Sequence, residues 1–348
     1  MSRTGNKPQV TINTIAEKSG FSPSTVSRVL NGRAKEFRIS KKTVDIINKV
    51  NSEYNYHPNP IAVNLRIKKS FTIGLVIPSL NNPFFVNITS ILNKQLTKKG
   101  YSIILAESEE DVKTEEHVIK QLYARNIDGI IMIPCNENDQ NKPLLDKIYN
   151  DGTPIIYIDR YIKDSEIPHI VTDNENGAYE GVKYLVENGH DRIACIQGLE
   201  GSSPCIDRRN GYLKALGEYN LKPFFIGGDE FSIECGIRET EKLLGKTEKP
   251  TAIFAMSSTI ALGVIKVLEK HGYKIPEDIS LLGFDDYIFL DYLASPLTTV
   301  SQPIDEISEL AVKALMDHLD GKDKLTDFKS IMLDSKLIHR KSIQHHIG

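Results

Sequence analysis

The sequence predicts an N-terminal all-α helix-turn-helix head followed by an α/β body of two lobes with parallel sheets. The first 70 residues are strongly basic and have apolar residues at helical spacing, whereas apolar runs of strand length alternate with helical stretches from Phe71 onward. The chain has 348 residues, which is too long for one packed core. With 40% hydrophobic and 26% charged residues, the composition is that of a folded globular protein and excludes a disordered chain.

Charge is distributed unevenly along the chain. Residues 1–70 contain thirteen Lys and Arg against four Asp and Glu, a net charge of +9, although the whole chain has a net charge of -3. The remaining residues contain 30 basic and 42 acidic groups and therefore carry -12. A small basic head on an acidic body indicates a module that binds a polyanion, and a solvated basic tail is the alternative.

Three short helices are expected in the head. Each has a Ser or Thr suited to cap its first turn, and the first two end at a glycine turn. In the second helix, Val26, Val29 and Leu30 fall on one face, which predicts a core-facing stripe. Two helices separated by a tight turn form a helix-turn-helix. The expected boundaries are Thr11 to Gly20, Ser22-Pro23 to Asn31-Gly32, and a start at Ser40.

A connector follows the head. Residues 51–70 contain two prolines and a basic patch, and Ile61, Ala62 and Leu65 lie at helical spacing after Pro60. A helix this short is marginal alone because nucleation costs more than a few hydrogen bonds return. We therefore expect a DNA-binding domain over 1–58, a hinge helix and linker over 59–70, and a body over 71–348.

The body contains apolar runs typical of strands buried on both faces of a parallel sheet. Some 270 residues exceed one such core, so two similar lobes with a crevice between them are expected. The predicted strands are Thr72 to Ile77, Ser102 to Ala106, Gly129 to Ile133, Pro154 to Ile158, Arg192 to Ile196, Phe224 to Ile226, Thr251 to Met256 and Ile279 to Phe284.

Several kinds of site have no motif in the sequence. No GxGxxG opens a helix, and GxxxxGK[ST], GxSxG and HExxH are absent, so neither a nucleotide cofactor nor a common hydrolase site is indicated. The four cysteines form no CxxC pair and the histidines have no metal-site spacing, which predicts reduced structural thiols and no metal. No apolar run could span a bilayer, and no secretory leader is evident. We expect a cytoplasmic protein with no cofactor.

The ordered motifs closely resemble those of the lactose-repressor/galactose-repressor (LacI/GalR) family. The resemblance covers the whole chain and implies a homodimeric, effector-controlled transcription factor that binds a pseudo-palindromic operator, with a body similar to periplasmic sugar-binding proteins. It implies lobes of about 71–169 with 299–328 and about 170–298 with 329–343. The matching stretches are Thr11 to Ala16, Gly20 to Gly32, Tyr56 to Asn59, Ile73 to Pro78, Asn82 to Phe85, Asp128 to Ile131, Arg208 to Tyr212, Pro250 to Ala255, Pro276 to Asp286 and Leu337 to Ser342.

The resemblance makes the second helix the recognition helix. Arg28 can donate a bidentate pair of hydrogen bonds to guanine, while a phosphate contact is the alternative for this residue. The expected base contacts are Pro23, Ser24 and Arg28, and the expected phosphate contacts are Thr11, Thr25 and Ser27.

Paired hinge helices in the family enter the minor groove, where a leucine wedges between base pairs. The matching positions here are Asn59, Ala62 and Leu65, and an intramolecular helix contact is the alternative for Leu65. Val63-Asn64 departs from the usual polar or basic pair before this leucine.

In the crevice, the resemblance implies an effector site for a sugar or sugar derivative. Aromatic faces can stack on the C–H surface of a sugar while Asp and Arg bind its hydroxyls, although ordinary core packing is the alternative for Phe84. Ser257-Ser258 departs from the Asn-Asp common in the family, which removes a charge and shortens the reach. The expected residues are Phe84, Phe85, Asp159, Arg160, Asp173, Arg208, Phe231, Ser257 and Asp285.

The main functional hypothesis is therefore a repressor of carbohydrate-utilisation genes that is not an enzyme. A solute-binding protein could use the same body, but the basic head argues against it. A sugar-processing enzyme could use Asp285-Asp286, but adjacent carboxylates on one loop rarely face one bond, and no nucleophile with a base is evident.

Overall fold

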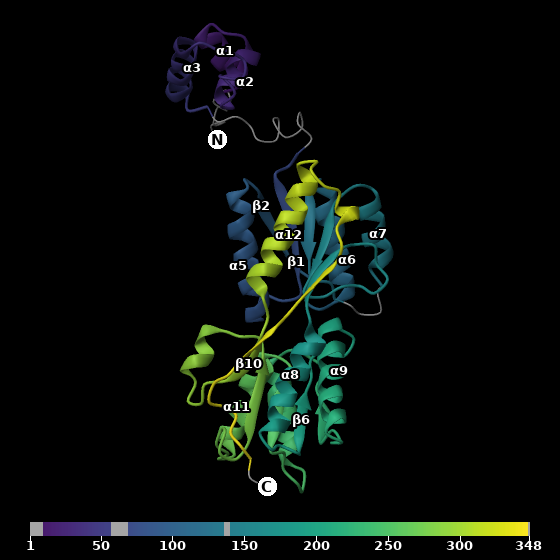
Figure 1. The fold of residues 1–348 in the computed structure, drawn as a ribbon. Helices are drawn as coiled ribbons and strands as arrows, with labels where there is room; N and C mark the ends of the chain where they lie inside the picture. Colours follow the sequence, from purple (N-terminus) through teal and green to yellow (C-terminus); the bar gives the residue numbers. More distant parts are fainter. Residues whose placement is uncertain (1–9, 57–68, 136–139, 347–348) are drawn as a thin grey trace, which may run out of the picture. The chain divides into compact units, whose positions relative to one another are not determined.

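The computed structural model describes residues 10–56, 69–135 and 140–346 (Figure 1). The chain divides into two compact units between Ser70 and Phe71, as expected for a head and a body. No helix in the described part of the chain is long and apolar enough to cross a membrane.

The head contains three helices around a small core. Ser22 and Ser40 cap α2 and α3 by accepting hydrogen bonds from the third backbone N–H of each helix, and Gly20 ends α1 with a φ of 74°. The α1 to α2 turn closes a helix-turn-helix, in agreement with the sequence prediction. The helices are α1 (Ile12–Ser19), α2 (Pro23–Leu30) and α3 (Lys41–Tyr54), and the buried apolar residues are Ile15, Ala16, Val26, Val29 and Ile47.

The first lobe of the body is built on a six-stranded sheet with the strand order β11-β5-β4-β3-β1-β2, in which every pairing is parallel. Helix α12 packs against α5 on this lobe (Figure 1). Its elements are β1 (Thr72–Ile77), α5 (Pro83–Lys98), β2 (Ser102–Glu107), α6 (Val112–Ala124), β3 (Gly129–Met132), α7 (Lys142–Asn150), β4 (Ile155–Ile158), β5 (His169–Thr172), α12 (Ile304–Leu319), η2 (Leu325–Asp327) and β11 (Ile331–Leu333).

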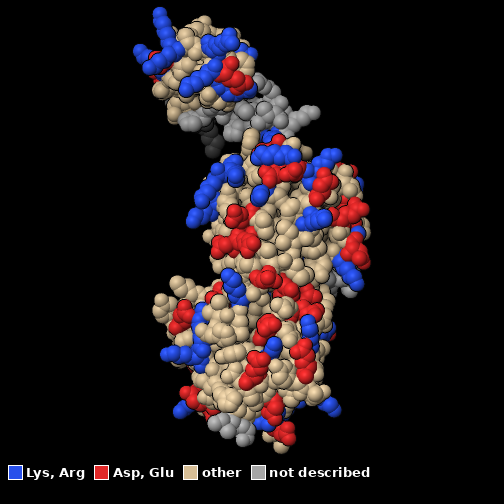
Figure 2. Space-filling model, in the orientation of Figure 1, with Lys and Arg blue, Asp and Glu red and all other residues tan. Residues whose placement is uncertain are grey.

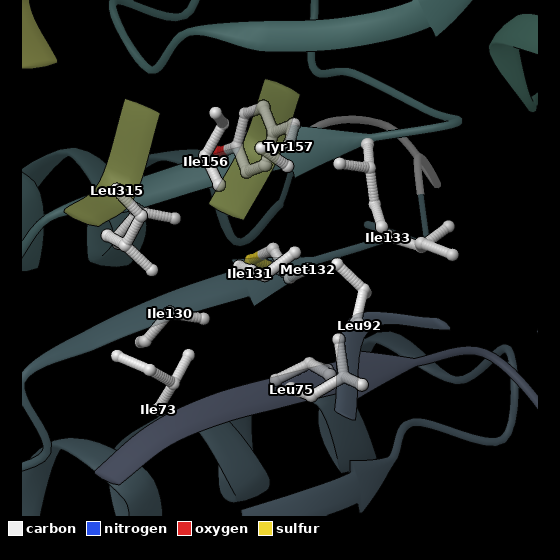
Figure 3. Close-up of a cluster of buried hydrophobic side chains, with 14 of the residues drawn as sticks. Ile73, Leu75, Leu92, Ile130, Ile131, Met132, Ile133, Ile156, Tyr157 and Leu315 are labelled. Carbon is white, nitrogen blue, oxygen red and sulfur yellow. The ribbon is translucent and has the colours of Figure 1, made fainter. Parts of the chain in front are cut away.

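The core of this lobe explains why its central strands are apolar throughout. Ile73, Leu75, Ile131 and Ile156 project from neighbouring strands and meet Leu92 and Leu315 from α5 and α12 (Figure 3). Strands covered by helices on both faces have no solvent side, so their sequences do not alternate.

The second lobe repeats this arrangement with the strand order β12-β10-β9-β8-β6-β7. Only its edge strand β12 runs antiparallel, beside β10. Helix α8 packs on α9, and α10 packs on α11. The elements are α8 (Asn174–Glu187), β6 (Ile193–Ile196), α9 (Ser203–Glu218), β7 (Phe225–Gly227), α10 (Ile233–Leu244), β8 (Ala252–Ala255), α11 (Ser258–Lys270), β9 (Ser280–Phe284), η1 (Ile288–Tyr292), β10 (Thr298–Ser301) and β12 (Lys336–Ile338).

The expected lobe boundaries need correction at all three crossovers, the segments where the chain passes from one lobe to the other. Strand β5 (169–172) pairs with β4 and β11 (331–333) pairs with β5, so both belong to the first lobe rather than the second. Strand β10 (298–301) pairs with β9 and belongs to the second lobe rather than the first. Neither these three strands nor β12 was predicted from the sequence. Their lobe is decided by which sheet offers hydrogen-bond partners.

Candidate ligand-binding and nucleic-acid-binding sites

The amino-terminal end of α2 presents a group of short polar side chains. The Ser22 hydroxyl accepts from the Thr25 backbone N–H at 3.2 Å and lies 2.9 Å from the hydroxyls of both Ser24 and Thr25. Pro23 and Ser24 are exposed. The helix therefore begins with hydroxyl groups at its surface, where its dipole favours an anion.

Arg28 lies one turn further along α2 and is exposed. Its guanidinium carbon is 4.0 Å from the centre of the Phe37 ring, and that of Arg33 is 5.1 Å from the same centre. Arg33 donates hydrogen bonds to both carboxylate oxygens of Glu36 at 2.6 and 2.7 Å. No hydrogen-bond partner for the Arg28 fork is found among the described residues, so this fork is oriented by stacking and open to an acceptor.

The three residues expected to contact phosphate lie in the same head. Thr11 is exposed at the start of α1 and forms a capping box with Thr14, while Thr25 and Ser27 are half-buried on α2. The Ser27 hydroxyl accepts from the Asn31 amide at 3.2 Å. The expected hinge positions Asn59, Ala62 and Leu65 lie outside the described residues.

A cavity lies between the two lobes of the body. Its walls come from the carboxyl ends of strands in both sheets, which is where open α/β sheets bind ligands. Eight of the nine effector residues expected from the sequence line it. The lining is Asn82, Phe84, Phe85, Asp159, Arg160, Pro204, Arg208, Phe231, Ser257, Asp285 and Gln302.

Asp159 and Arg160 follow β4 and form the polar wall contributed by the first lobe. Arg160 is almost fully buried and donates from its two terminal nitrogens to Glu110 at 2.7 and 2.9 Å. Asp159 lies 3.9 Å from Arg160 Nε, and no hydrogen bond to its carboxylate is found among the described residues. Burial raises the pKa of Asp159 to about 6, with Arg160 and Arg208 acting in the opposite direction.

Arg208 and Asp285 form the matching wall of the second lobe. Arg208 donates to the Asn174 side chain at 2.8 Å and to the Met256 carbonyl at 2.6 Å, and its third nitrogen lies 4.0 Å from Asp285. Burial lowers the pKa of Arg208 and raises that of Asp285. The pair thus faces the cavity in a desolvated setting where hydrogen bonds to a ligand are strong.

Gln302 connects this wall to the crossovers. Its amide nitrogen donates to Asp285 at 2.6 Å, and its amide oxygen accepts from Thr172 at 2.6 Å. Thr172 ends β5, and Gln302 follows β10. One side chain therefore joins two crossover segments to a cavity aspartate, so a ligand at Asp285 is in contact with the part of the body where the lobes meet.

Aromatic rings complete the cavity. Phe84 and Phe85 stand at the start of α5 with their rings edge to face at 5.5 Å, and Phe231 faces them from the second lobe. Phe84 and Phe85 are 4% and 3% exposed, so they are core residues and cavity walls at once. The combination of ring faces with buried Asp and Arg suits a ligand that has both C–H surfaces and hydroxyl groups.

Two predicted residues have other contacts in the structure. Asp173 does not line the cavity; its carboxylate caps α8 by accepting from the Asn176 N–H at 2.9 Å. Ser257 lines the cavity, but its hydroxyl caps α11 by accepting from the Ile260 N–H at 3.2 Å. Asp173 directly follows β5, Ser257 follows β8 after one residue, and each precedes a helix, so the capping role and the ligand role have a similar local pattern in sequence.

The adjacent carboxylates of Asp285 and Asp286 diverge. Asp286 accepts hydrogen bonds from Arg340 at 2.7 and 3.2 Å and from the Thr299 hydroxyl at 2.7 Å, whereas Asp285 faces the cavity. Asp285 and Asp286 therefore do not face each other as a pair of carboxylates across one bond.

None of the four cysteines lines the cavity. All four cysteines are free and buried, and burial raises the pKa of each thiol. Across the described residues, no group of three His, Cys, Asp or Glu side chains is placed to hold a metal ion.

Three cavity residues were missed by the sequence analysis: Asn82, Pro204 and Gln302. Asn82 precedes Pro83 in the pattern of an N-cap, which its hydrogen bond from the Phe84 N–H at 3.0 Å bears out. Gln302 follows β10, a strand that the sequence analysis also missed. A prediction of β10 would have placed a glutamine at a strand carboxyl end and marked it as a candidate.

Fold and sites together define a class of protein: a helix-turn-helix nucleic-acid-binding head joined to a two-lobed body with a ligand cavity. Residues 11–59 match the family model for bacterial regulatory proteins of the lacI family, and residues 70–325 match that for periplasmic binding proteins and the sugar-binding domain of the LacI family. The chain belongs to the LacI family of bacterial regulatory proteins.

Relatives match over almost the full chain. The chain is 35% identical to the NTD biosynthesis operon regulator NtdR of Bacillus subtilis (strain 168), with 95% of this chain and 99% of the relative covered. It is 30% identical to the ribose operon repressor of Haemophilus influenzae, with 96% and 98% covered. Among solved structures, a lac repressor dimer bound to operator and the anti-inducer ONPF is 26% identical, with 96% and 99% covered and a TM-score of 0.87.

Proposed function

We propose that this protein is a homodimeric, DNA-binding transcriptional repressor whose affinity for its operator is controlled by a small polyhydroxylated effector. The observation that carries the proposal is the cavity, which is lined from both lobes by buried Asp, Arg and Phe side chains in a chain that also has a basic helix-turn-helix head. Relatives named as repressors, one of them of a ribose operon, support this function. Such a regulator acts on the chromosome and therefore in the cytoplasm.

An effector can change DNA affinity only by binding one arrangement of the lobes more tightly than another. A ligand that contacts Asp159 on one lobe and Arg208 or Asp285 on the other favours the arrangement in which these groups are close together. Gln302 joins Asp285 to the crossovers, so this preference extends to the segments that join the lobes.

The experiment that tests the function measures operator and effector binding separately. Fluorescence anisotropy should identify a duplex from upstream of the gene that the protein binds specifically. Shuffled DNA of equal length should not displace this duplex from the protein. A thermal-shift screen of pentoses, hexoses and disaccharides should then find a sugar that stabilises the protein. If no duplex competes better than shuffled DNA, the regulator function is wrong.

The cavity assignment has its own test. Arg208→Ala or Asp285→Ala should abolish the effect of that sugar on operator affinity. If the sugar is a co-repressor, these variants should abolish operator binding itself. If the sugar is an inducer, the variants should still bind operator without sugar, and this binding shows that they are folded. Unchanged sugar affinity in both variants would remove these residues from the site.

The recognition helix offers a matched pair of variants. Arg28 and Arg33 stack on the same Phe37 ring, but only Arg33 has its fork occupied by Glu36. Arg28→Ala should cost about 1–3 kcal/mol of operator binding and relax preference at one base pair of each half-site. Arg33→Ala should leave sequence preference unchanged. A loss in Arg28→Ala that is equal for all sequences would mean that Arg28 binds phosphate.

We further propose that Leu65 acts as the minor-groove wedge of the hinge. Leu65→Ala should weaken specific operator binding by about 2–3 kcal/mol, because an unstacked base step and its apolar contact are lost. Affinity for the effector should change little. Equal affinity of the variant and the parent protein for the operator would show that Leu65 packs within its own chain.

A further inference from the structure

Phe231 lies between charged groups of both lobes. It belongs to the loop between β7 and α10, and its ring centre is 5.9 Å from the guanidinium carbon of Arg160 on the first lobe. The same ring centre is 5.9 Å from the guanidinium carbon of Arg208 on the second lobe. This one ring is therefore close to a buried arginine from each lobe.

A chain of hydroxyl groups holds the backbone of Phe231. The Thr259 hydroxyl is 3.0 Å from the Phe231 carbonyl oxygen, which can only accept, so Thr259 donates its proton there. The Ser257 hydroxyl lies 2.8 Å from that of Thr259 and therefore donates to it. Ser257 in turn accepts from the Ile260 N–H at the start of α11. The hydrogen bonds run in one direction from a helix end to the loop that carries the ring.

Gly198 limits the ring from another direction. It follows β6, and a Cβ atom at this position would lie 2.3 to 2.4 Å from three atoms of the Phe231 ring. The backbone of Gly198 is not in the left-handed region, so the glycine is needed here for space rather than for conformation. Any side chain at this position would displace the ring.

We infer that Thr259 and Gly198 are positioning residues that fix the Phe231 ring between Arg160 and Arg208. Neither residue lines the cavity, so both act through the ring. The relevance of this ring to effector binding rests on the proposed function, whereas its fixed position is a property of the body alone. Of the two serines that replace the Asn-Asp common in the family, Ser257 both caps α11 and begins the hydroxyl chain, whereas Ser258 donates to the Phe284 carbonyl at 2.9 Å.

The absence of tryptophan from the chain provides a direct measurement. In full-length Phe231→Trp protein the single indole reports its own surroundings through its emission maximum and its quenching by acrylamide. Adding Thr259→Val, which keeps the side-chain shape but removes the hydroxyl, should shift the emission to longer wavelength and increase quenching. Adding Thr259→Ser, which keeps the hydroxyl, should restore both values.

The control for Thr259 is Thr251→Val. Thr251 is a buried threonine of the same lobe whose hydroxyl donates to the Arg192 carbonyl at 3.5 Å, away from the cavity. This variant should leave the indole signal unchanged. The inference is overturned if Thr259→Val also leaves the indole signal unchanged. It is equally overturned if Thr259→Ser shifts the indole signal as far as Thr259→Val does, because the hydroxyl chain then does not position the ring.

Gly198→Ala tests the second positioning residue in the same background, with Gly217→Ala as its control. Gly217 lies within α9, and a Cβ atom there meets no heavy atom within 4 Å. Gly198→Ala should shift the indole signal and Gly217→Ala should not, and equal signals would overturn the role of Gly198.

If an indole at position 231 prevents folding, the native ring is followed by ¹⁹F NMR of fluorophenylalanine-labelled protein, with Phe231→Leu assigning its resonance. The same variants and controls are then compared by the ¹⁹F chemical shift of Phe231. Thr259→Val and Gly198→Ala should change this shift, and an unchanged shift would overturn the inference. All of these measurements are made without DNA or sugar. A failure of operator or effector binding therefore leaves this inference standing, and a failure of this inference leaves the proposed function standing.

Discussion

Asp159 and Asp285 occupy equivalent places at the carboxyl ends of β4 and β9, and both have left-handed backbone conformations, with φ of 64° and 69°. Aspartate tolerates this region better than most residues, and such conformations cluster at functional sites. Their surroundings differ, because Asp285 accepts a hydrogen bond from Gln302 whereas none to Asp159 is found among the described residues. The Asp159 carboxylate is therefore free to accept a hydrogen bond from a ligand.

The raised pKa of Asp159 predicts a pH-dependent stability. Its folded pKa of about 6 lies above the ordinary value of 3.8, so the folded state holds the proton more tightly than the unfolded state. This contribution to stability is complete below about pH 4 and is lost as pH rises through about 6. Asp159→Asn cannot ionise and should therefore gain about 1–3 kcal/mol relative to the parent protein between pH 4 and pH 8.

Denaturant unfolding of sugar-free protein at pH 4.5 and pH 8 measures this gain. Asp173→Asn is the control, because Asn also caps a helix and position 173 does not line the cavity. A constant difference between Asp159→Asn and the parent protein across this pH range would show that the carboxylate is solvated.

At the scale of elements, the head depends on caps because its helices are short. Helix α2 has eight residues, and isolated helices of this length are marginal. Ser22 accepts the hydrogen bond that begins α2 and also contacts the hydroxyls of Ser24 and Thr25. One side chain therefore supports both the helix and the polar surface at its amino-terminal end.

Ser22→Ala should cost about 1 kcal/mol of local stability, because an amide of the first turn loses its acceptor. Hydrogen exchange of amides in 23–31 should become faster. Ser52→Ala removes a hydroxyl that donates to the Asn48 carbonyl inside α3 and caps nothing, so it should leave exchange in α2 unchanged. Unchanged exchange in Ser22→Ala would mean that packing alone holds the helix.

At the scale of the whole molecule, charge is separated between a head of +9 and a body of -12. On its visible face the head shows Lys and Arg side chains at several places beside a smaller acidic cluster, and the body shows many side chains of both signs (Figure 2). Binding through the head displaces counterions from DNA, while the acidic body adds no attraction.

Operator affinity should therefore fall steeply with salt. For a protein that makes six to ten phosphate contacts, a loss on the order of 10³ or more is expected between about 50 and 200 mM salt. Titrations of operator and shuffled duplex at several salt concentrations measure both slopes. A specific affinity that is independent of salt would contradict recognition through the basic head.

Local patterns were sufficient for much of the molecule. Caps and glycine stops mark the head helices, and continuous apolar runs mark the central strands, because both depend on neighbours in sequence. The eight cavity residues that were expected came from the family resemblance, and those that follow β4, β8 and β9 lie where parallel strands present their carboxyl ends at one edge. The family resemblance itself is carried by these same motifs.

Only the tertiary structure decided the rest. Strands β5, β10, β11 and β12 form because a distant strand edge supplies hydrogen-bond partners, so neither their presence nor their lobe follows from local sequence. Gln302 reaches the cavity through such a strand. Ser257 and Asp173 have side chains that can cap or bind, and the choice between these roles depends on which donors the folded chain places within 3 Å or so. Sequence determines which groups are available, and long-range packing determines which of them remain free for a ligand.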